Sequence, residues 1–162
     1  IYDLFDGKPK LELLYEAKEH DFSGPAFHSA CDNKGPTLIV AKSKKECIFG
    51  WFTTIEWKSS GGWKKNDSGA TTWLFKVESP NSVPKFIMKD DHYYGLYDSN
   101  SYLPSIEPLI LENRGNQGEP CSAGNGSSGL IMPEGMAQIS SDYFAGQCYF
   151  GLMELEVYSV DE

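Results

Sequence analysis

The feature that most constrains the fold of this chain is a series of short apolar runs, each bounded by glycine, proline or polar residues. The runs are rich in β-branched and aromatic side chains, which favour extended strands. Many short strands separated by turn residues predict a mainly β fold, a two-layer β-sandwich. The runs cover residues 37–41, 47–55, 72–77, 86–88, 109–111 and 149–160.

Local patterns refine these runs. Those at 37–41 and 47–55 are separated by a short polar turn, so we expect them to pair as a hairpin. Along 72–77, Trp73, Phe75 and Val77 fall on one face of a strand. In the last run, residues 149–160, successive side chains of a strand would point alternately to the two faces of the sheet. Met153, Leu155 and Val157 are expected on one face, and Glu154, Glu156 and Tyr158 on the other.

One helix is predicted over residues 23–31. Ser23 can cap its free amide groups, Pro25 suits its first turn, and Gly35 lies just beyond its end. Residues 11–19 are ambiguous, because their apolar positions alternate as in a strand while their composition also suits a helix.

Two further segments read as connections. Residues 59–69 are predicted to be a turn-rich stretch. Residues 113–135 contain six glycines and Cys121. A structureless loop of this length is unusual in a compact domain, so we expect it to be functional, fixed by its cysteine or mobile.

The length and net charge of the chain limit the classes of function it can have. The 162 residues suit a single domain over 1–162. The net charge of −9 argues against binding to nucleic acid or to anionic membranes, since both rely on cationic contacts. No apolar run approaches the length of a membrane-spanning helix, so we expect no membrane insertion. The chain starts at Ile1, and we expect either a processed mature protein or an excised domain.

The compartment depends on how the cysteines and sequons are interpreted. The spacing of the cysteines contains no zinc-binding pair, and their even number permits either two disulfides or free buried thiols. The sequons at Asn66 and Asn125 are expected in surface loops and favour secretion. The cysteines are Cys31, Cys47, Cys121 and Cys148.

The order and spacing of several short segments resemble a TLDc domain, the oxidation-resistance type of domain. The resemblance spans nearly the whole chain, and no single motif carries it. The segments are Leu13-Leu14-Tyr15, Phe27-His28, Lys34-Gly35-Pro36-Thr37-Leu38, Ile48-Phe49-Gly50, Trp73-Leu74-Phe75 and Glu154-Leu155-Glu156-Val157-Tyr158. The resemblance implies two antiparallel sheets flanked by short helices. It also implies that the domain is an interaction module without an established catalytic centre. Several members of the family dock onto the V-type proton ATPase.

Three sets of residues could carry chemistry. Glu154 and Glu156 share a strand face about 7 Å apart, a spacing seen in paired catalytic carboxylates, although acids on a solvated strand face or at a partner contact fit as well. His28 and Cys31 lie one helical turn apart, as a nucleophile pair would, or as an ordinary helix face. The third set is a possible calcium site, formed by the oxygen-bearing residues Asp90, Asp91, Asp98 and Asn100. We expect no catalytic residue and no required cofactor or metal.

The aromatic residues are the stronger indication. Trp63 lies in a glycine- and lysine-rich turn, and the segment 93–97 cannot bury all its rings on one side of a strand. Exposed rings beside acidic residues suit contacts with a partner or stacking on a sugar. The predicted binding residues are Trp63, Tyr93, Tyr94, Tyr97, Asp98, Asn100, Glu154 and Glu156.

Two functions remain open. The first is a non-enzymatic module that binds a protein, with the V-type proton ATPase implied by the family. The alternative is a small secreted protein that binds a carbohydrate or another small ligand, as a lectin does. Ile1, the even cysteine count and the two sequons tilt the expected location toward secretion.

Overall fold

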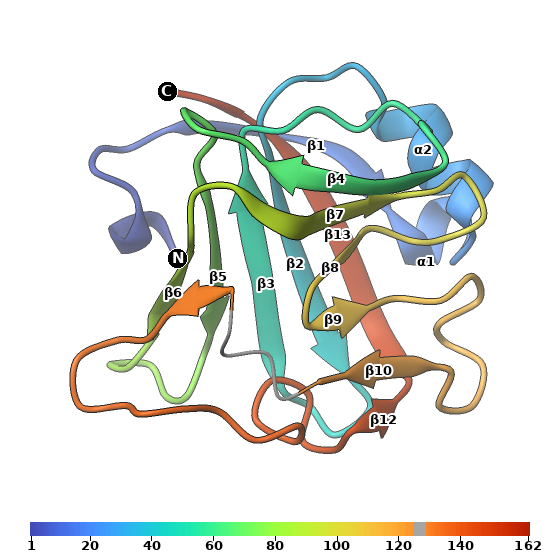
Figure 1. Ribbon diagram of the computed structural model, residues 1–162. Coiled ribbons are helices and arrows are strands. Elements are labelled where there is room, and N and C mark those ends of the chain that lie inside the picture. Colours follow the sequence, from blue (N-terminus) through green and yellow to red (C-terminus); the bar gives the residue numbers. More distant parts are fainter. Residues whose placement is uncertain (125–128) are drawn as a thin grey trace.

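The computed structural model, which describes residues 1–124 and 129–162, is built from two antiparallel sheets (Figure 1). The mainly β architecture predicted from the sequence is confirmed. The larger sheet has seven strands, in the spatial order β1 (Lys10–Glu16), β13 (Leu152–Asp161), β2 (Thr37–Ser43), β3 (Ile48–Thr53), β5 (Thr72–Lys76), β6 (Lys85–Met88) and β11 (Leu130–Ile131).

The smaller sheet has six strands and lies across the larger one, so that the strands of the two layers cross steeply (Figure 1). Most of its strands have only two or three residues, and the two long ones lie together at one edge. Its spatial order is β12 (Tyr149–Phe150), β10 (Cys121–Ala123), β9 (Leu109–Ile110), β8 (Ser105–Ile106), β7 (His92–Asp98) and β4 (Gly62–Asn66).

The helices are short and peripheral: the 3₁₀ turn η1 (Tyr2–Leu4), α1 (Ala17–His20) and α2 (Gly24–Cys31). The predicted helix is confirmed as α2. Ser23 Oγ accepts a hydrogen bond from the Ala26 amide at 3.2 Å, and Pro25 occupies the first turn. Among the described residues, no helix has the length and apolar character that crossing a bilayer requires.

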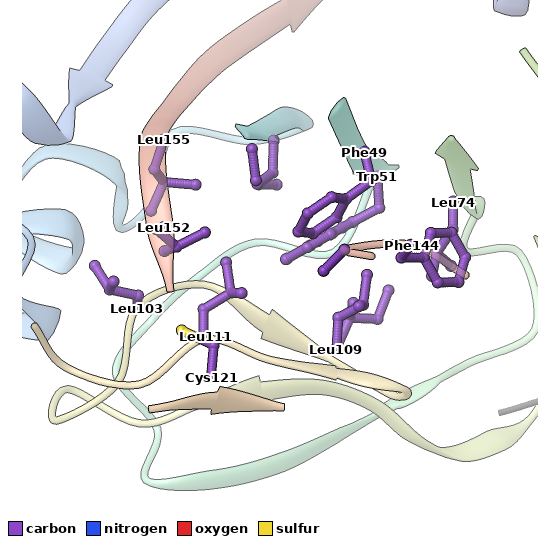
Figure 2. Packing of buried hydrophobic residues seen from close by; sticks show 14 of the residues in the cluster. Phe49, Trp51, Leu74, Leu103, Leu109, Leu111, Cys121, Phe144, Leu152 and Leu155 are labelled. Atoms are coloured by element: carbon purple, nitrogen blue, oxygen red, sulfur yellow. The ribbon is translucent and has the colours of Figure 1, made fainter. Parts of the chain in front are cut away.

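The core lies between the two sheets (Figure 2). Side chains from β3, β5 and β13 meet those of the shorter strands, and Phe49, Trp51 and Leu74 are fully buried there. The predicted hairpin is confirmed as β2 paired with β3. A Cβ atom at Gly50 would lie 1.9 Å from the Ile39 carbonyl oxygen, so only glycine fits at this crossing of the hairpin.

A second apolar cluster covers the outer face of the seven-stranded sheet. One cross-strand row takes an apolar residue from every strand: Leu13, Tyr158, Leu38, Phe52, Trp73, Ile87 and Ile131. The Phe5 ring covers its centre, with its centroid 5.3 Å from that of Phe52 and 5.1 Å from that of Trp73. The predicted common face of Trp73, Phe75 and Val77 is confirmed, and it belongs to this outer cluster.

One open prediction is resolved and two others need correction. The ambiguity at residues 11–19 is resolved, since the segment is strand up to Glu16, where β1 ends, and helix from Ala17, where α1 begins. The segment 59–69 is not all turn, because it contains β4. The last run is not one strand: β12 belongs to the smaller sheet and β13 to the larger, with Gly151 between them.

An irregularity in β13 also changes the expected alternation. A register shift between Leu152 and Glu154 turns Met153 out to solvent, whereas Leu155 and Val157 point into the core as predicted. The long segment 113–135 is not structureless either, because it contributes β10 and β11 to the two sheets.

Candidate functional site

Five aromatic side chains form a continuous series at the β4–β7 edge of the smaller sheet. Successive ring centroids are 4.8 Å apart for Tyr93 and Tyr94, 5.3 Å for Tyr94 and Trp63, 5.0 Å for Trp63 and Tyr97, and 4.8 Å for Tyr97 and Tyr102. We call these five residues the aromatic ridge. The structure therefore brings together the four aromatic residues predicted as binding residues and adds Tyr102 to them.

Strand pairing builds the ridge. Trp63 on β4 lies directly opposite Tyr97 on β7, and a register shift in β4 follows between Lys64 and Asn66. The two backbones come so close that a Cβ atom at Gly95 would lie 2.5 Å from the Lys64 carbonyl oxygen. Glycine is thus needed in the middle of the tyrosine-rich strand to let the strand that carries Trp63 approach.

Three of the five ridge rings are exposed to solvent, while Tyr97 and Tyr102 are partly buried. Tyr93 is 66% exposed, Tyr94 46% and Trp63 37%. The other tryptophans of the chain, Trp51, Trp57 and Trp73, are all buried. Large rings usually bury most of their surface, so a group of exposed ones is unusual on a folded domain and is typical of contact surfaces.

The charged side chains beside the ridge are acids and lysines, and the lysines are already paired within the protein. Lys65 Nζ lies 3.4 Å from a carboxylate oxygen of Asp91, and Lys64 turns inward, away from solvent. At the other end, the pKa of Tyr102 is raised, first by the Glu112 carboxylate and then by burial. Desolvation raises the pKa of Glu112 as well. The nearby lysines are therefore engaged within the protein, and acidic groups lie at both ends of the ridge.

Asp98 follows Tyr97 directly but points to the opposite side of β7, where it is fully buried. Lys64 Nζ lies 3.4 Å from its carboxylate. The carboxylate also accepts hydrogen bonds at 2.7 to 3.1 Å from three successive amides and one hydroxyl, those of Lys58, Ser59, Ser60 and the Ser60 side chain. Burial alone would raise the pKa of Asp98, but these hydrogen bonds and the Lys64 charge outweigh it and hold the pKa below its ordinary value.

His28 and Asp32 complete a buried group with Asp98, which we call the carboxylate cluster. His28 Nδ1 lies 2.6 Å from Asp32 and 3.8 Å from Asp98. The Ser59 hydroxyl donates to Asp32 at 2.5 Å, so it bonds the acid and not the imidazole. This order does not activate a serine nucleophile, which needs the base beside its hydroxyl.

Among the described residues, the carboxylate cluster is the one place where three potential metal-ligating side chains gather. Asp98 already receives four hydrogen bonds and the Lys64 ammonium, which occupy the lone pairs a cation would need. The cluster fastens the loop at residues 58–60 to β7, a structural role.

The proposed calcium ligands do not form one group. Asp90 and Asp91 precede β7, whereas Asp98 ends it and Asn100 follows. The strand between them spans about 20 Å at 3.3 Å per residue, too far for one ion to bridge. Asp98 is also turned inward, so the expectation of an oxygen-rich loop cluster is wrong.

Of the remaining predicted binding residues, Asn100 lies in the turn between two ridge residues, Tyr97 and Tyr102, and the two glutamates lie in the other sheet. Asn100 is exposed in the turn after β7. Glu154 and Glu156 lie on β13, in the other sheet. Glu154 accepts a hydrogen bond from Lys18 at 3.0 Å, which lowers its pKa, and Glu156 accepts one from the Tyr158 hydroxyl. Each acid therefore has its own partner.

The cysteines are all free, so the disulfides that their even number permitted are not formed in this structure. Cys31 and Cys121 are buried, and desolvation raises the pKa of each thiol to about 12. Cys31 is thus protonated at neutral pH, unlike the thiolate that nucleophilic catalysis uses. Cys47 and Cys148 are partly buried.

The two sequons have different outcomes. Asn66 is not in a surface loop as expected. It lies in β4 and is fully buried, and its side-chain amide donates to the Lys89 carbonyl at 3.0 Å. A glycan attached there would break this contact. Asn125 lies outside the described residues.

Comparison with known families gives one clear result. A family model of the TLDc domain matches residues 2–161, which is essentially the whole chain. No curated protein matches the chain.

Proposed function

Because the chain belongs to the TLDc domain family, we propose that it acts as a non-enzymatic module that binds other proteins through the aromatic ridge. The family supports protein interaction as the general role. The ridge is the part of the described surface that we assign to this contact.

One observation carries the proposal: the five ridge rings contact each other in series, and three of them, Tyr93, Tyr94 and Trp63, are exposed to solvent. Aromatic residues dominate the energetics of protein contacts because they bury much apolar area at little cost in side-chain entropy. The core does not need these rings, since it already contains Trp51, Trp57 and six buried phenylalanines among its large side chains. A partner would desolvate rings that now face water.

The geometry favours a protein over a sugar. Sugars stack on the open faces of aromatic rings, but neighbouring ridge rings meet at interplanar angles of 60° to 85°. Such rings present alternating edges and faces. The V-type proton ATPase, which the family resemblance implies as a partner, stays a prediction.

A random-peptide display library, selected on the immobilised domain, tests the proposal. We expect the selected peptides to bind the natural domain and to lose at least tenfold in affinity for the Tyr93→Ala variant. Tyr149→Ala is the matched control, since Tyr149 is also 66% exposed but lies on β12, at the opposite edge of the same sheet. Equal losses for both variants, or for neither, would show that the ridge is not the binding surface.

The carbohydrate alternative is tested with the same variants. A glycan array probed with the natural domain and with Tyr93→Ala should give no signal that depends on the ridge. Reproducible glycan binding that is lost in Tyr93→Ala and kept in Tyr149→Ala would replace the protein-binding proposal with the lectin-like one.

A further inference from the structure

We infer that the outer face of the seven-stranded sheet is a second interaction surface, and that its partner is residues 1–8 of a second copy of this chain. We call residues 1–8 the strap, because in one copy they lie across this face. The surface is separate from the aromatic ridge, so the inference does not depend on the proposed function. Three observations carry it: the weak attachment of the strap, the exposed connection that follows it, and the exposed ends of the apolar row beneath it.

The strap lies on the sheet without joining it. It contributes a strand to neither sheet, and no residue of its 3₁₀ turn η1 is buried. Leu4 and Phe5 supply its apolar contacts, and the Phe5 ring meets Phe52 and Trp73 by its edge, as described above. In the described part of the chain, a single hydrogen bond joins the strap to the sheet, from Lys85 Nζ to the Leu4 carbonyl at 2.8 Å. The strap is therefore held by far fewer interactions than a paired strand.

The packing around the strap is incomplete. A hollow of about 240 Å³ is lined by Phe5 together with Phe52, Trp73 and Ile87, and a second of about 300 Å³ runs along residues 5–9. Closely packed interiors leave few spaces of this size, and each such space removes part of the dispersion attraction between the surfaces that line it. The strap can therefore leave the sheet more easily than an element of the core could.

Residues 6–8 form a connection on which the strap can swing outward. All three are exposed, and a Cβ atom at Gly7 would meet no other atom within 4 Å. The next residue, Pro9, is buried, and β1 begins at Lys10. The chain is thus fixed from Pro9 onward, while glycine allows a change of backbone direction just before it. Identical copies exchange elements from an arrangement of this kind, because the contacts in the exchanged pair are the same as in one copy.

A second copy is the occupant for two reasons. Its strap is the one segment whose fit on this face the structure displays, and exchange would cover apolar side chains that one copy leaves open. Leu13 at one end of the row, and Ile87 and Ile131 at the other, are each about half exposed, as is Tyr2 in the strap. A connection of three residues spans at most about 11 Å, so exchange brings the two outer faces close together. Burial of these side chains then favours the pair.

Sedimentation of the natural protein at increasing concentration tests the inference. The strap of the same copy competes at an effective concentration on the order of millimolar, so we expect dimers as the protein approaches about 1 mM. Added salt should raise the dimer fraction, because it screens the repulsion between two chains of net charge −9. Phe5→Ala should weaken association at least about fivefold, because two ring contacts are lost. A monomer at every concentration, or a dimer of unchanged strength in Phe5→Ala, would overturn the inference.

Two control variants separate this surface from the rest of the molecule. Tyr93→Ala removes an exposed ring of the ridge, and Tyr149→Ala removes an equally exposed ring on β12. Both should associate as the natural protein does. Association that is weakened in either control as much as in Phe5→Ala would assign the dimer to another surface and overturn the inference.

A mixture of two full-length variants distinguishes exchange from simple stacking of the outer faces. Phe5→Ala has a defective strap but an intact face, whereas Lys85→Glu has an intact strap but lacks the donor to Leu4 on its face. We expect an equimolar mixture to form more dimer than either variant alone, since the intact strap of one copy can reach the intact face of the other. Dimer no more abundant in the mixture than in the separate variants would overturn exchange.

A labelled peptide of residues 1–9 gives a second, independent measurement. It should bind Phe5→Ala at least about fivefold more tightly than it binds the natural protein, whose own strap competes for the same face. The same peptide with alanine in place of its phenylalanine should bind neither protein. Equal binding of the two peptides, or no binding to Phe5→Ala, would contradict the proposed exchange.

Discussion

Tyr97 and Asp98 are neighbours on β7, yet they face opposite sides of the sheet and belong to opposite kinds of site. Tyr97 lies in the aromatic ridge, where it is partly buried between Trp63 and Tyr102 and where three of the five rings are exposed to solvent. Asp98 lies in the carboxylate cluster, where amides, a hydroxyl and a lysine already occupy the carboxylate.

The comparison shows that the residue types at a site do not by themselves indicate its function. The carboxylate cluster has the residue types of a metal or catalytic site, but its interactions are satisfied from within the protein. The ridge has no titratable group of catalytic kind, but its rings contact one another and three of them are exposed to solvent. Residues that await a partner should cost little stability when changed, whereas residues that hold the fold should cost much.

The largest effect should come from Asp98→Ala. This change leaves three backbone amides, the Ser60 hydroxyl and the Lys64 ammonium without their acceptor, and we expect the free energy of unfolding to fall by about 3–5 kcal/mol. Chemical denaturation of both proteins measures the difference. A fall below about 1 kcal/mol would mean that the carboxylate cluster does not hold the loop at residues 58–60.

The pH dependence of stability tests the same carboxylate. Because the pKa of Asp98 is lower in the folded than in the unfolded state, its ionisation stabilises the fold above the unfolded pKa. That stabilisation should be lost as pH falls through the folded pKa, below the ordinary value near 3.8. Asp98→Asn should be less stable than the natural protein at neutral pH, and its stability should depend less on pH below about pH 4. Parallel acid profiles would contradict this assignment.

Trp63→Ala should have an intermediate effect on stability. The ring is partly exposed but makes edge-to-face or tilted contacts with Tyr94 and Tyr97. Each such contact contributes about 0.5–1.5 kcal/mol, so for the two contacts we expect a loss of about 1–3 kcal/mol, with peptide binding abolished. Thermal unfolding and peptide binding should be measured on one sample. A loss above about 3 kcal/mol would be typical of a core tryptophan and would mean that Trp63 mainly stabilises the fold.

The smallest effect should come from Glu154→Gln. Its ion pair with Lys18 joins two half-exposed side chains, and such pairs contribute about 0–1 kcal/mol. We therefore expect a loss of at most about 0.5 kcal/mol and no change in peptide binding. A change in binding would extend the functional surface to the other sheet, as the sequence alone suggested.

The parts of the fold that local pattern determines were predictable. Helix α2 has its cap at Ser23, and the β2–β3 hairpin has two strongly apolar runs around a polar turn. Strand β4 was not predictable in this way, because its glycine- and lysine-rich composition reads as a turn. It is extended because it pairs with β7, which is distant in sequence.

The same division holds for the candidate site. Crowded rings at 93–97 and a tryptophan in a polar segment correctly indicated exposure. The joining of Tyr102 to the ridge, and the position of Glu112 beside it, depend on the turn after β7 and on an isolated bridge between Tyr102 and Glu112, which no sequence pattern indicates. Asp98 and Asn66 were misplaced for a simpler reason: both lie on strands, where alternation turns every second side chain inward.

The most direct test of the account is a map of backbone amide chemical shifts, recorded as a library-selected peptide is added to the isotopically labelled domain. The account predicts the largest shifts at Trp63, Tyr93, Tyr94, Tyr97 and Tyr102, with small ones at His28 and Asp32. Shifts centred on the carboxylate cluster, or on the outer face of the seven-stranded sheet around Trp73 and Ile87, would contradict it.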